Sequence, residues 1–184
     1  MAAIIALVIV LLVPVFMYNS LVARKNQVDN VFGSIDALLK KRYDLIPNLV
    51  ATVQAYMQHE KGTLEEVTAL RTRALASGLS NDEKIDLDNK MSKVLGGIMV
   101  AVENYPQLKA SQNFLELQKA MNEVEEQVSA ARRAYNAAVT DYNNGVEMFP
   151  TNILAGMMGF RRKQVFFIPE EERGAPNVKE MFGK

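Results

Sequence analysis

The chain has 184 residues, 49% of them hydrophobic and 23% charged, which is typical of one folded domain with or without appendages. Its 21 lysines and arginines balance 21 aspartates and glutamates, a neutrality that gives no support to a nucleic-acid partner. The absence of cysteine excludes disulfides, cysteine zinc sites and thiol catalysis, and only one histidine, His59, is present for imidazole chemistry.

Residues 1–23 are predicted to form a membrane-spanning helix. No charged side chain precedes Arg24, and 23 helical residues at about 1.5 Å each reach roughly 34 Å, enough to cross a hydrocarbon core. A cleaved secretory signal is the alternative. It is disfavoured because no basic residue precedes the apolar run and no small-x-small cleavage site follows it. We therefore expect an uncleaved anchor.

The charges beside this anchor predict its orientation. Arg24 and Lys25 follow the apolar run directly, and Lys40, Lys41 and Arg42 come soon after. Because lysine and arginine close to a span favour the cytoplasmic side, we expect a short N-terminus outside and the remaining chain in the cytoplasm.

Apolar residues at helical spacing predict four long helices after the anchor. The first covers residues 21–57 and is able to continue the membrane helix as one rod, with a kink or shift of its axis near Asp44 because Pro47 lies inside the pattern. The expected apolar stripe of this helix is Val28, Val31, Ile35, Leu38, Leu45, Leu49 and Tyr56, widened by Leu39, Ile46, Val50 and Val53. Capping signals place the later helices from Thr63 to Ser77-Gly78, from Ser80 to a point before Pro106, and from Ser111 to Asn144-Gly145.

These elements predict an all-α fold: an N-terminal transmembrane helix followed by an antiparallel bundle of long helices, with coiled-coil-like packing. We divide the chain into an anchor (1–23), a helical bundle (24–148), and a short helix with an extended tail (149–184). Gly96-Gly97 interrupts the third bundle helix, and close approach of a neighbouring helix explains this pair better than a ligand slot does.

The residue inventory disfavours an enzyme. Di-iron bundles need Glu-x-x-His motifs from two helices, and His59-Glu60 lacks the second histidine of a zinc protease motif. No phosphate-binding glycine loop and no nucleophile elbow is present. We expect no catalytic, cofactor-binding or metal-binding residue, no cofactor, and no small-molecule substrate.

Two segments are candidate contact sites. Arg42, Tyr43, Asp44 and Pro47 combine charge, an aromatic ring and a helix breaker, which suits an interaction surface; the alternative is a kink at which Arg42 and Asp44 pair with neighbours. The second segment combines basic and aromatic residues, which suits a membrane surface or a partner; the alternative is a tail held along the bundle by its aromatic rings. Its residues are Phe160, Arg161, Arg162, Lys163, Phe166 and Phe167.

Several motifs along most of the chain resemble the LemA family of bacterial proteins. They are Tyr18-Asn19-Ser20, Val31-Phe32-Gly33-Ser34, the run from Arg42 to Val50, His59-Glu60, Tyr105-Pro106, Arg133-Ala134-Tyr135-Asn136, Tyr142-Asn143, Phe149-Pro150 and Gly159-Phe160. The resemblance implies a single-pass protein of the bacterial inner membrane with a cytoplasmic helical bundle. It implies no catalytic residues, and a relative in magnetosome formation implies a membrane-organising role for some members.

The leading functional hypothesis is a non-enzymatic, membrane-anchored scaffold or adaptor. It would act through helical surfaces on further copies of itself, as a homo-oligomer, or on other membrane proteins. The alternative is a sensor or signalling subunit that works with another membrane protein, and a cryptic hydrolase or metal enzyme is the least favoured class.

Overall fold

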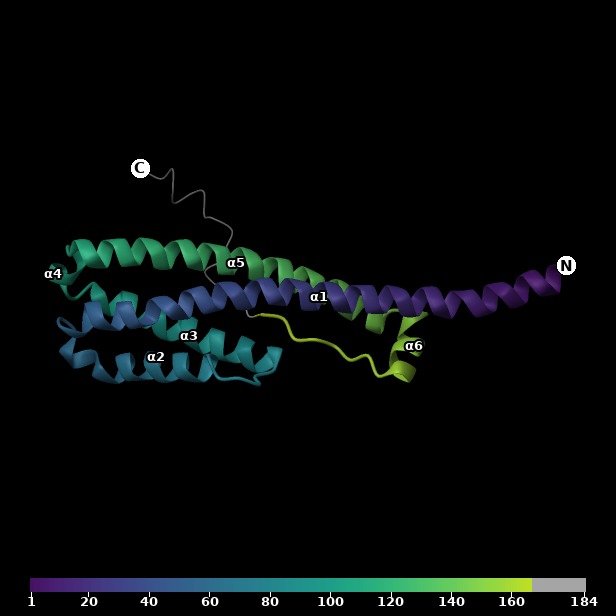
Figure 1. Ribbon diagram of the computed structural model, residues 1–184, viewed down its shortest axis with the longest axis horizontal. Helices are drawn as coiled ribbons and strands as arrows, with labels where there is room; N and C mark the ends of the chain where they lie inside the picture. The colour runs from purple at the N-terminus through teal and green to yellow at the C-terminus, as the bar shows by residue number, and fades with distance from the viewer. Residues whose placement is uncertain (167–184) are drawn as a thin grey trace, which may run out of the picture.

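The computed structural model describes residues 1–166, with the backbone alone for residues 6 and 7, and this part is helical with no strand. The predicted all-α fold is thereby confirmed. Figure 1 shows the elements in order. They are α1 (Ala2–Gln54), the short 3-10 helix η1 (Gln58–Glu60), α2 (Lys61–Ala74), α3 (Asn81–Val102), α4 (Pro106–Lys109), α5 (Gln112–Glu147) and α6 (Thr151–Met158).

Helix α1 joins the apolar N-terminal segment to the bundle without a break. It has 53 residues and runs through both Pro14 and Pro47, which confirms the prediction of one rod. Its N-terminal part projects beyond the bundle, where the apolar side chains of residues 4–5 and 8–16 are exposed, and Leu21, 1% exposed, is the first buried residue of the described chain. Within residues 1–166, α1 is the one helix long and apolar enough to cross a membrane. The shift of its axis near Asp44 stays a prediction.

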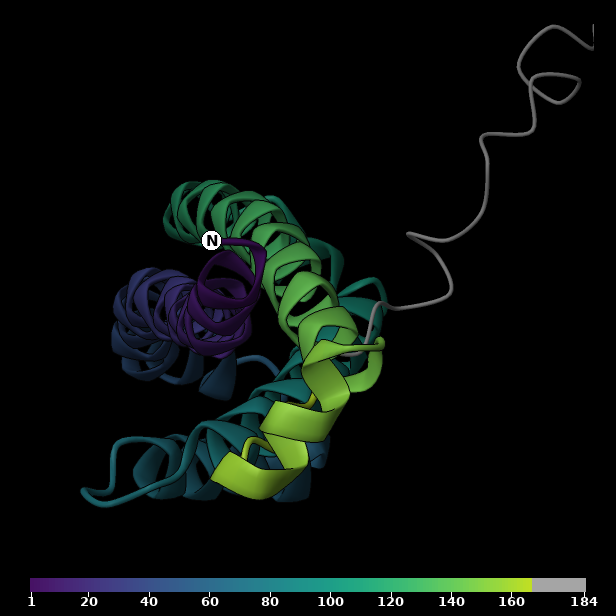
Figure 2. The same cartoon turned by 90° about the vertical axis from the view of Figure 1, so that its right-hand side faces the viewer.

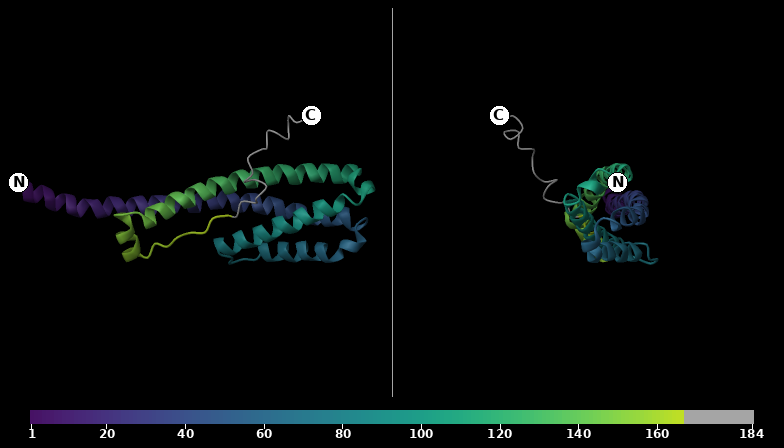
Figure 3. Two further views of the ribbon diagram at one scale, coloured as in Figure 1. Left: turned by 180° about the vertical axis from the view of Figure 1, so that it is seen from behind. Right: turned by 90° about the vertical axis from the view of Figure 1, so that its left-hand side faces the viewer.

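The bundle is antiparallel. Helices α1 and α5 lie side by side in opposite directions over most of its length, and the α2–α3 hairpin covers them from one side (Figures 1 and 3). Short connections at alternating ends, η1, the turn before Ser80 and α4, make each helix reverse the direction of the last. The core fills the space between these four helices.

The buried stripe of α1 is rotated toward one side of the predicted one, because Leu39, Ile46 and Val53, expected to widen the stripe, are fully inside it. Val31, Leu38 and Leu45 are only partly buried, and Tyr56 is 42% exposed. The difference arises because Arg42 and Tyr43 are interior residues, so the 3–4 spacing runs through them and not through the apolar positions beside them. The observed stripe is Val28, Phe32, Ile35, Leu39, Tyr43, Ile46, Leu49 and Val53.

Two of the predicted helix starts are confirmed and one is wrong. Ser80 caps α3 in a reciprocal capping box with Glu83, and Ser111 is the N-cap residue of α5. Thr63 is not an N-cap, because η1 leads directly into α2, which begins two residues earlier at Lys61. Leu64, Val67 and Leu70 form the buried side of α2.

The glycines have different roles from those predicted. Among residues 1–166, a Cβ added at Gly96 or Gly97 would meet no atom within 4 Å, so none of the described helices approaches this pair closely. Asn144-Gly145 does not end α5, which continues to Glu147. Gly145 is itself the point of close approach, since a Cβ there would lie 3.2 Å from Leu21 Cδ2 and 3.2 Å from Arg24 Cδ.

Replacing Ser80 with alanine should lower the free energy of unfolding by about 1 kcal/mol at neutral pH, because the Glu83 N–H loses its acceptor. The hydrogen bonds that Glu83 accepts from Ser80 lower the pKa of its carboxyl. A lowered folded-state pKa means that the added stabilisation by the Glu83 carboxylate is complete above the ordinary value of 4.5 and is lost as the pH falls through the folded value. Urea unfolding across this range tests both statements. An equal effect of Ser80→Ala at pH 7 and well below pH 4.5 would contradict the role of the Glu83 charge.

Candidate functional site

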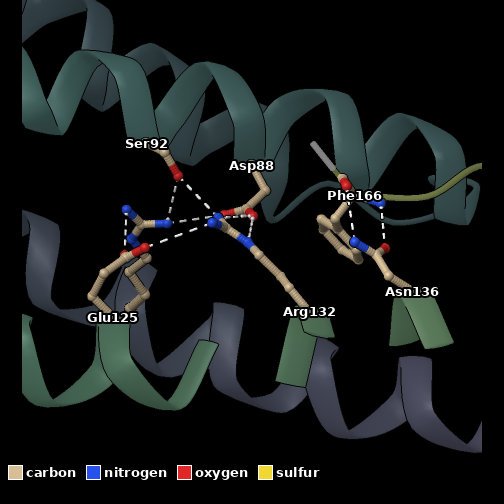
Figure 4. A network of polar contacts seen from close by, with 7 residues as sticks. Asp88, Ser92, Glu125, Arg132, Asn136 and Phe166 are labelled. Carbon is tan, nitrogen blue, oxygen red and sulfur yellow. Dashed lines mark hydrogen bonds and ion pairs between the residues drawn. The ribbon is translucent and has the colours of Figure 1, made fainter. Parts of the chain in front are cut away.

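A cluster of charged side chains lies inside the bundle, between α1, α3 and α5 (Figure 4). Asp88 of α3 is completely buried and accepts hydrogen bonds from Arg42 of α1, at 3.1 Å, and from Arg132 Nε of α5, at 3.1 Å. The Ser92 hydroxyl accepts from the same two guanidinium groups, at 3.0 and 2.9 Å. One carboxylate therefore joins two arginines that are 90 residues apart in the sequence.

Glu125 completes the charge balance of this cluster. Its carboxylate lies 2.7 Å from Arg42 Nη2 and 3.6 Å from Arg132 Nη1, and it is partly exposed. Two guanidinium groups thus meet two carboxylates, so the cluster is neutral as a whole. Because every buried charge has a partner of opposite sign, hydrogen bonds offset the free-energy cost of removing these charges from water. The cluster thereby fixes the relative positions of the three helices.

Next to this cluster, aromatic rings bind the segment that follows α6. The Phe166 ring, 1% exposed, lies 5.3 Å from the Tyr135 ring and 6.4 Å from the Phe32 ring, centroid to centroid. Arg132 Cζ is 5.8 Å from the centre of the Phe166 ring, which favours a cation–π contact. Residues 160–166, here named the strap, therefore end in the core of their own bundle.

Two asparagines of α5 hold the strap by its backbone. Asn136 donates to the Phe166 carbonyl at 3.0 Å and accepts from the Phe166 N–H at 2.8 Å. Asn143 makes the same pair of hydrogen bonds with Lys163, at 3.0 and 2.9 Å. Seven helical residues rise about 10.5 Å and three extended residues about 10 Å. The distance along α5 from Asn136 to Asn143 therefore matches the distance along the strap from Phe166 to Lys163.

The tyrosines before these asparagines complete the arrangement. The Tyr142 hydroxyl donates to the Arg161 carbonyl at 2.9 Å. Burial raises the pKa of Tyr135 to about 12, and burial also raises the pKa of Tyr142. Burial and the nearby Asp88 charge raise the pKa of Tyr43 as well. All three phenols are therefore neutral at physiological pH and available as hydrogen-bond donors.

Replacing Asn136 or Asn143 with alanine should free the strap locally. Each substitution leaves one N–H and one carbonyl of residue 166 or 163 without its partner, at a cost of about 1–3 kcal/mol. Hydrogen exchange should therefore become faster at the Phe166 amide for Asn136→Ala and at the Lys163 amide for Asn143→Ala. Asn144→Ala, at an exposed neighbouring position, is the matched control. Unchanged exchange in both variants would show that the asparagines do not hold the strap.

The strap brings α6 and the start of the bundle together. The Phe160 ring contacts the Tyr18 ring, with centroids 6.1 Å apart. Lys163 pairs with Asp29 of α1, and Arg162 Nε lies 2.9 Å from Glu147. These contacts join the strap to α1 and α5 where α1 enters the bundle.

The structure corrects the expectation of an interaction surface at Arg42 and Tyr43. Both side chains are 4% exposed and belong to the core. Asp44 is exposed and pairs with Lys40 at 2.8 Å, and Pro47 is exposed. This arrangement matches the alternative expectation, in which Arg42 and Asp44 pair with neighbours.

The candidate contact residues of the tail differ in how exposed they are. Phe166 is buried on its own bundle, which corrects its assignment as a membrane or partner contact. Phe160 and Lys163 are partly buried, whereas Arg161 and Arg162 are exposed. Phe167 lies outside the described residues.

Sequence reasoning missed Asp88, Glu125, Arg132 and the paired asparagines. A signal for the asparagines was present, because the dipeptide Tyr-Asn occurs at 135–136 and again seven residues later. Nothing in the local sequence distinguishes Asp88 from the exposed Asp86. His59 lies exposed on η1, and among residues 1–166 no three histidine, aspartate or glutamate side chains are placed to hold a metal ion together.

Comparison with known proteins gives a family and several relatives. The model of the LemA family matches residues 31–179. Protein LemA of Metamycoplasma hominis is 25% identical over 163 residues, which cover 89% of this chain and 74% of that protein. Magnetosome protein MamQ 2 of Paramagnetospirillum magneticum is 22% identical over 174 residues, which cover 81% of this chain and 64% of that protein. Magnetosome protein MamQ of Magnetospirillum gryphiswaldense is 24% identical over 94 residues, 51% of this chain and 35% of that protein. The chain therefore spans less than two thirds of the length of these two magnetosome proteins.

Proposed function

The chain belongs to the LemA family, and from that premise we propose that it is a non-enzymatic, membrane-anchored scaffold or adaptor that acts through its helical surfaces. The similarity to proteins named as magnetosome proteins supports a role in organising membranes. The proposed parts are the span at residues 1–23, the bundle at 24–148, and the short helix and tail at 149–184. We place the bundle on the cytoplasmic side of a bacterial inner membrane, on the basis of Arg24 and Lys25.

The observation that carries this proposal is the continuity of α1. The same helix supplies the exposed apolar segment and one side of the bundle core, so no flexible linker separates them. Leu21 of α1 packs against Gly145 of α5, where the absence of a side chain allows the two helices to approach closely. This contact joins α1 and α5 at the end of the bundle nearest the proposed span. A bundle held in a fixed direction from the bilayer presents its surfaces in a defined orientation, as a scaffold requires.

The mass of the full chain in detergent and in nanodiscs tests the proposal. A second measurement uses residues 19–184, which keep Leu21 and the whole buried core. Assembly of both forms supports a scaffold with contacts in the bundle. Assembly of the full chain alone places the contacts in the bilayer. Monomers in both cases would refute self-assembly and leave an adaptor for another membrane protein.

A sensor or signalling subunit is the second candidate function, supported by a groove at the far end of the bundle. The groove has a volume of about 680 Å³ and lies between the end of α1 and α2, with mainly apolar walls that include Val50, Met57 and Leu64. A ligand there would contact the same helix that forms the span. Hydrogen exchange of the full chain with and without a long-chain fatty acid tests this function. Slower exchange that extends along α1 toward Arg24 supports it, and an unchanged pattern argues against it.

A further inference from the structure

Helix α6 carries an apolar face that no other part of residues 1–166 covers. Ala155, on its inner side, is 1% exposed, whereas Ile153 and Met157 are 58% and 79% exposed. These two residues are four positions apart, so their side chains share one face of the helix. Phe149, just before the helix, is also 79% exposed, and α6 itself contains no charged residue. Such a concentration of large exposed apolar side chains marks an interaction surface.

The position of α6 indicates what covers this face. Figure 2, which looks at the molecule from its N-terminal side, shows α6 lying across the end of the bundle. Phe160, just after α6, contacts Tyr18, and Gly145, just before it, approaches Leu21. A span of about 20 residues from the start of α1 ends at this level. If residues 1–23 cross a bilayer, α6 is therefore at the level where the hydrocarbon core meets the lipid headgroups.

The polar residues around α6 suit the same location. An open cleft of about 490 Å³ beside α6 is lined by residues that include Tyr18, Lys25, Phe160 and Arg161. Lys25 and Arg161 are exposed and form no ion pair with a described residue. The other cations here are neutralised, because Arg162 pairs with Glu147, Lys163 with Asp29, and Arg24 with Asp141. Exposed cations beside aromatic rings are typical of the interface of an anionic bilayer.

We propose that α6 is an interfacial helix. Its exposed face, Phe149, Ile153 and Met157, lies in the headgroup region of the same bilayer that α1 crosses, and Lys25 and Arg161 contact anionic headgroups. This proposal rests on the proposed membrane anchoring by residues 1–23. It adds a second membrane contact, which fixes the angle between the bundle and the membrane.

Single-cysteine labelling of the full chain tests the proposal, and the natural chain has no cysteine to remove. Met157→Cys carries an environment-sensitive fluorophore in nanodiscs of phosphatidylcholine and phosphatidylglycerol, with one chain per disc. Val10→Cys, in the span, is the control for anchoring, and Val100→Cys, 72% exposed on α3, is the control for water exposure. Each label is quenched with aqueous iodide and with a lipid that carries a nitroxide near its headgroup. One chain per disc prevents a second copy from covering α6.

The expected result is that the Met157 label is quenched by the nitroxide lipid and is at least about twofold less sensitive to iodide than the Val100 label. Iodide sensitivity at Met157 equal to that at Val100, with Val10 protected, would overturn the interfacial helix and leave the anchor intact. Exposure of Val10 would overturn the anchor itself. Replacing both Lys25 and Arg161 with glutamine should lower the quenching of the Met157 label by the nitroxide lipid, which does not depend on the repulsion of iodide by phosphatidylglycerol. Unchanged quenching would overturn the assignment of Lys25 and Arg161.

Discussion

Replacing Asp88 with alanine should lower the free energy of unfolding by about 3–5 kcal/mol, because two buried guanidinium groups lose the carboxylate that they share. Asp88 is completely buried, and Arg42 and Arg132 are 4% and 5% exposed, so water cannot replace the lost charge without opening the bundle. After this change both arginines keep the Ser92 hydroxyl and one charged partner, Glu125, which lies at the partly exposed edge of the cluster. Urea denaturation of the full chain in detergent micelles, followed by circular dichroism, measures this loss.

The matched control for this experiment is Asp86→Ala, two positions earlier on the same helix. Asp86 is exposed, so its replacement should change the free energy of unfolding by no more than about 0.5 kcal/mol. Asp88→Asn retains one acceptor and should fall between the two variants. A cost of Asp88→Ala as small as that of Asp86→Ala would mean that the charge cluster does not form as the structure places it.

The charge cluster fixes the relative positions of α1, α3 and α5 more than it raises the net free energy of unfolding. A neutral buried cluster is often no more stabilising than apolar residues of the same volume, whereas a charge left without its partner is costly. Any sliding of α3 against α1 or α5 would leave Arg42, Asp88 or Arg132 unpaired inside the core. The cluster therefore penalises alternative registers of three helices. Such a fixed register suits a protein whose span and bundle share one rod.

The parts of the fold that depend on local chemistry were predictable from the sequence. The uncharged N-terminal run is continuous in the sequence, and the capping box of Ser80 with Glu83 acts within one turn, so the sequence alone locates both. The rotation of the α1 stripe was not predictable in the same way. It depends on Arg42 being buried, and burial of an arginine depends on Asp88, which is 46 residues away.

The candidate site was harder to predict for a related reason. A glycine inside a helix has the same effect on helix propensity wherever it occurs, so the sequence does not distinguish Gly145 from Gly96-Gly97. Only the three-dimensional arrangement shows that Gly145 of α5 faces Leu21 and that no described residue packs on Gly96-Gly97 of α3. The strap is the exception. The Tyr-Asn dipeptide occurs twice in α5, seven residues apart, and each of its asparagines binds the backbone of the strap.

Replacing Phe166 with alanine should lower the free energy of unfolding by about 3–5 kcal/mol, because the buried ring leaves a cavity between Phe32 and Tyr135. The same change removes the aromatic face beside Arg132. Val165→Ala is the matched control, since Val165 is 45% exposed and its replacement should cost less than about 1 kcal/mol.

Hydrogen exchange at Lys163 shows whether loss of the Phe166 ring releases the whole strap or only its end. If the ring is the main attachment of the strap, Phe166→Ala should also speed hydrogen exchange at Lys163, although Asn143 and its two hydrogen bonds are unchanged. Faster exchange at Phe166 alone would instead mean that each asparagine holds its own section of the strap. An effect on stability no larger than that of Val165→Ala would contradict the burial of Phe166. Because the strap continues from α6, its release should also speed hydrogen exchange in α6.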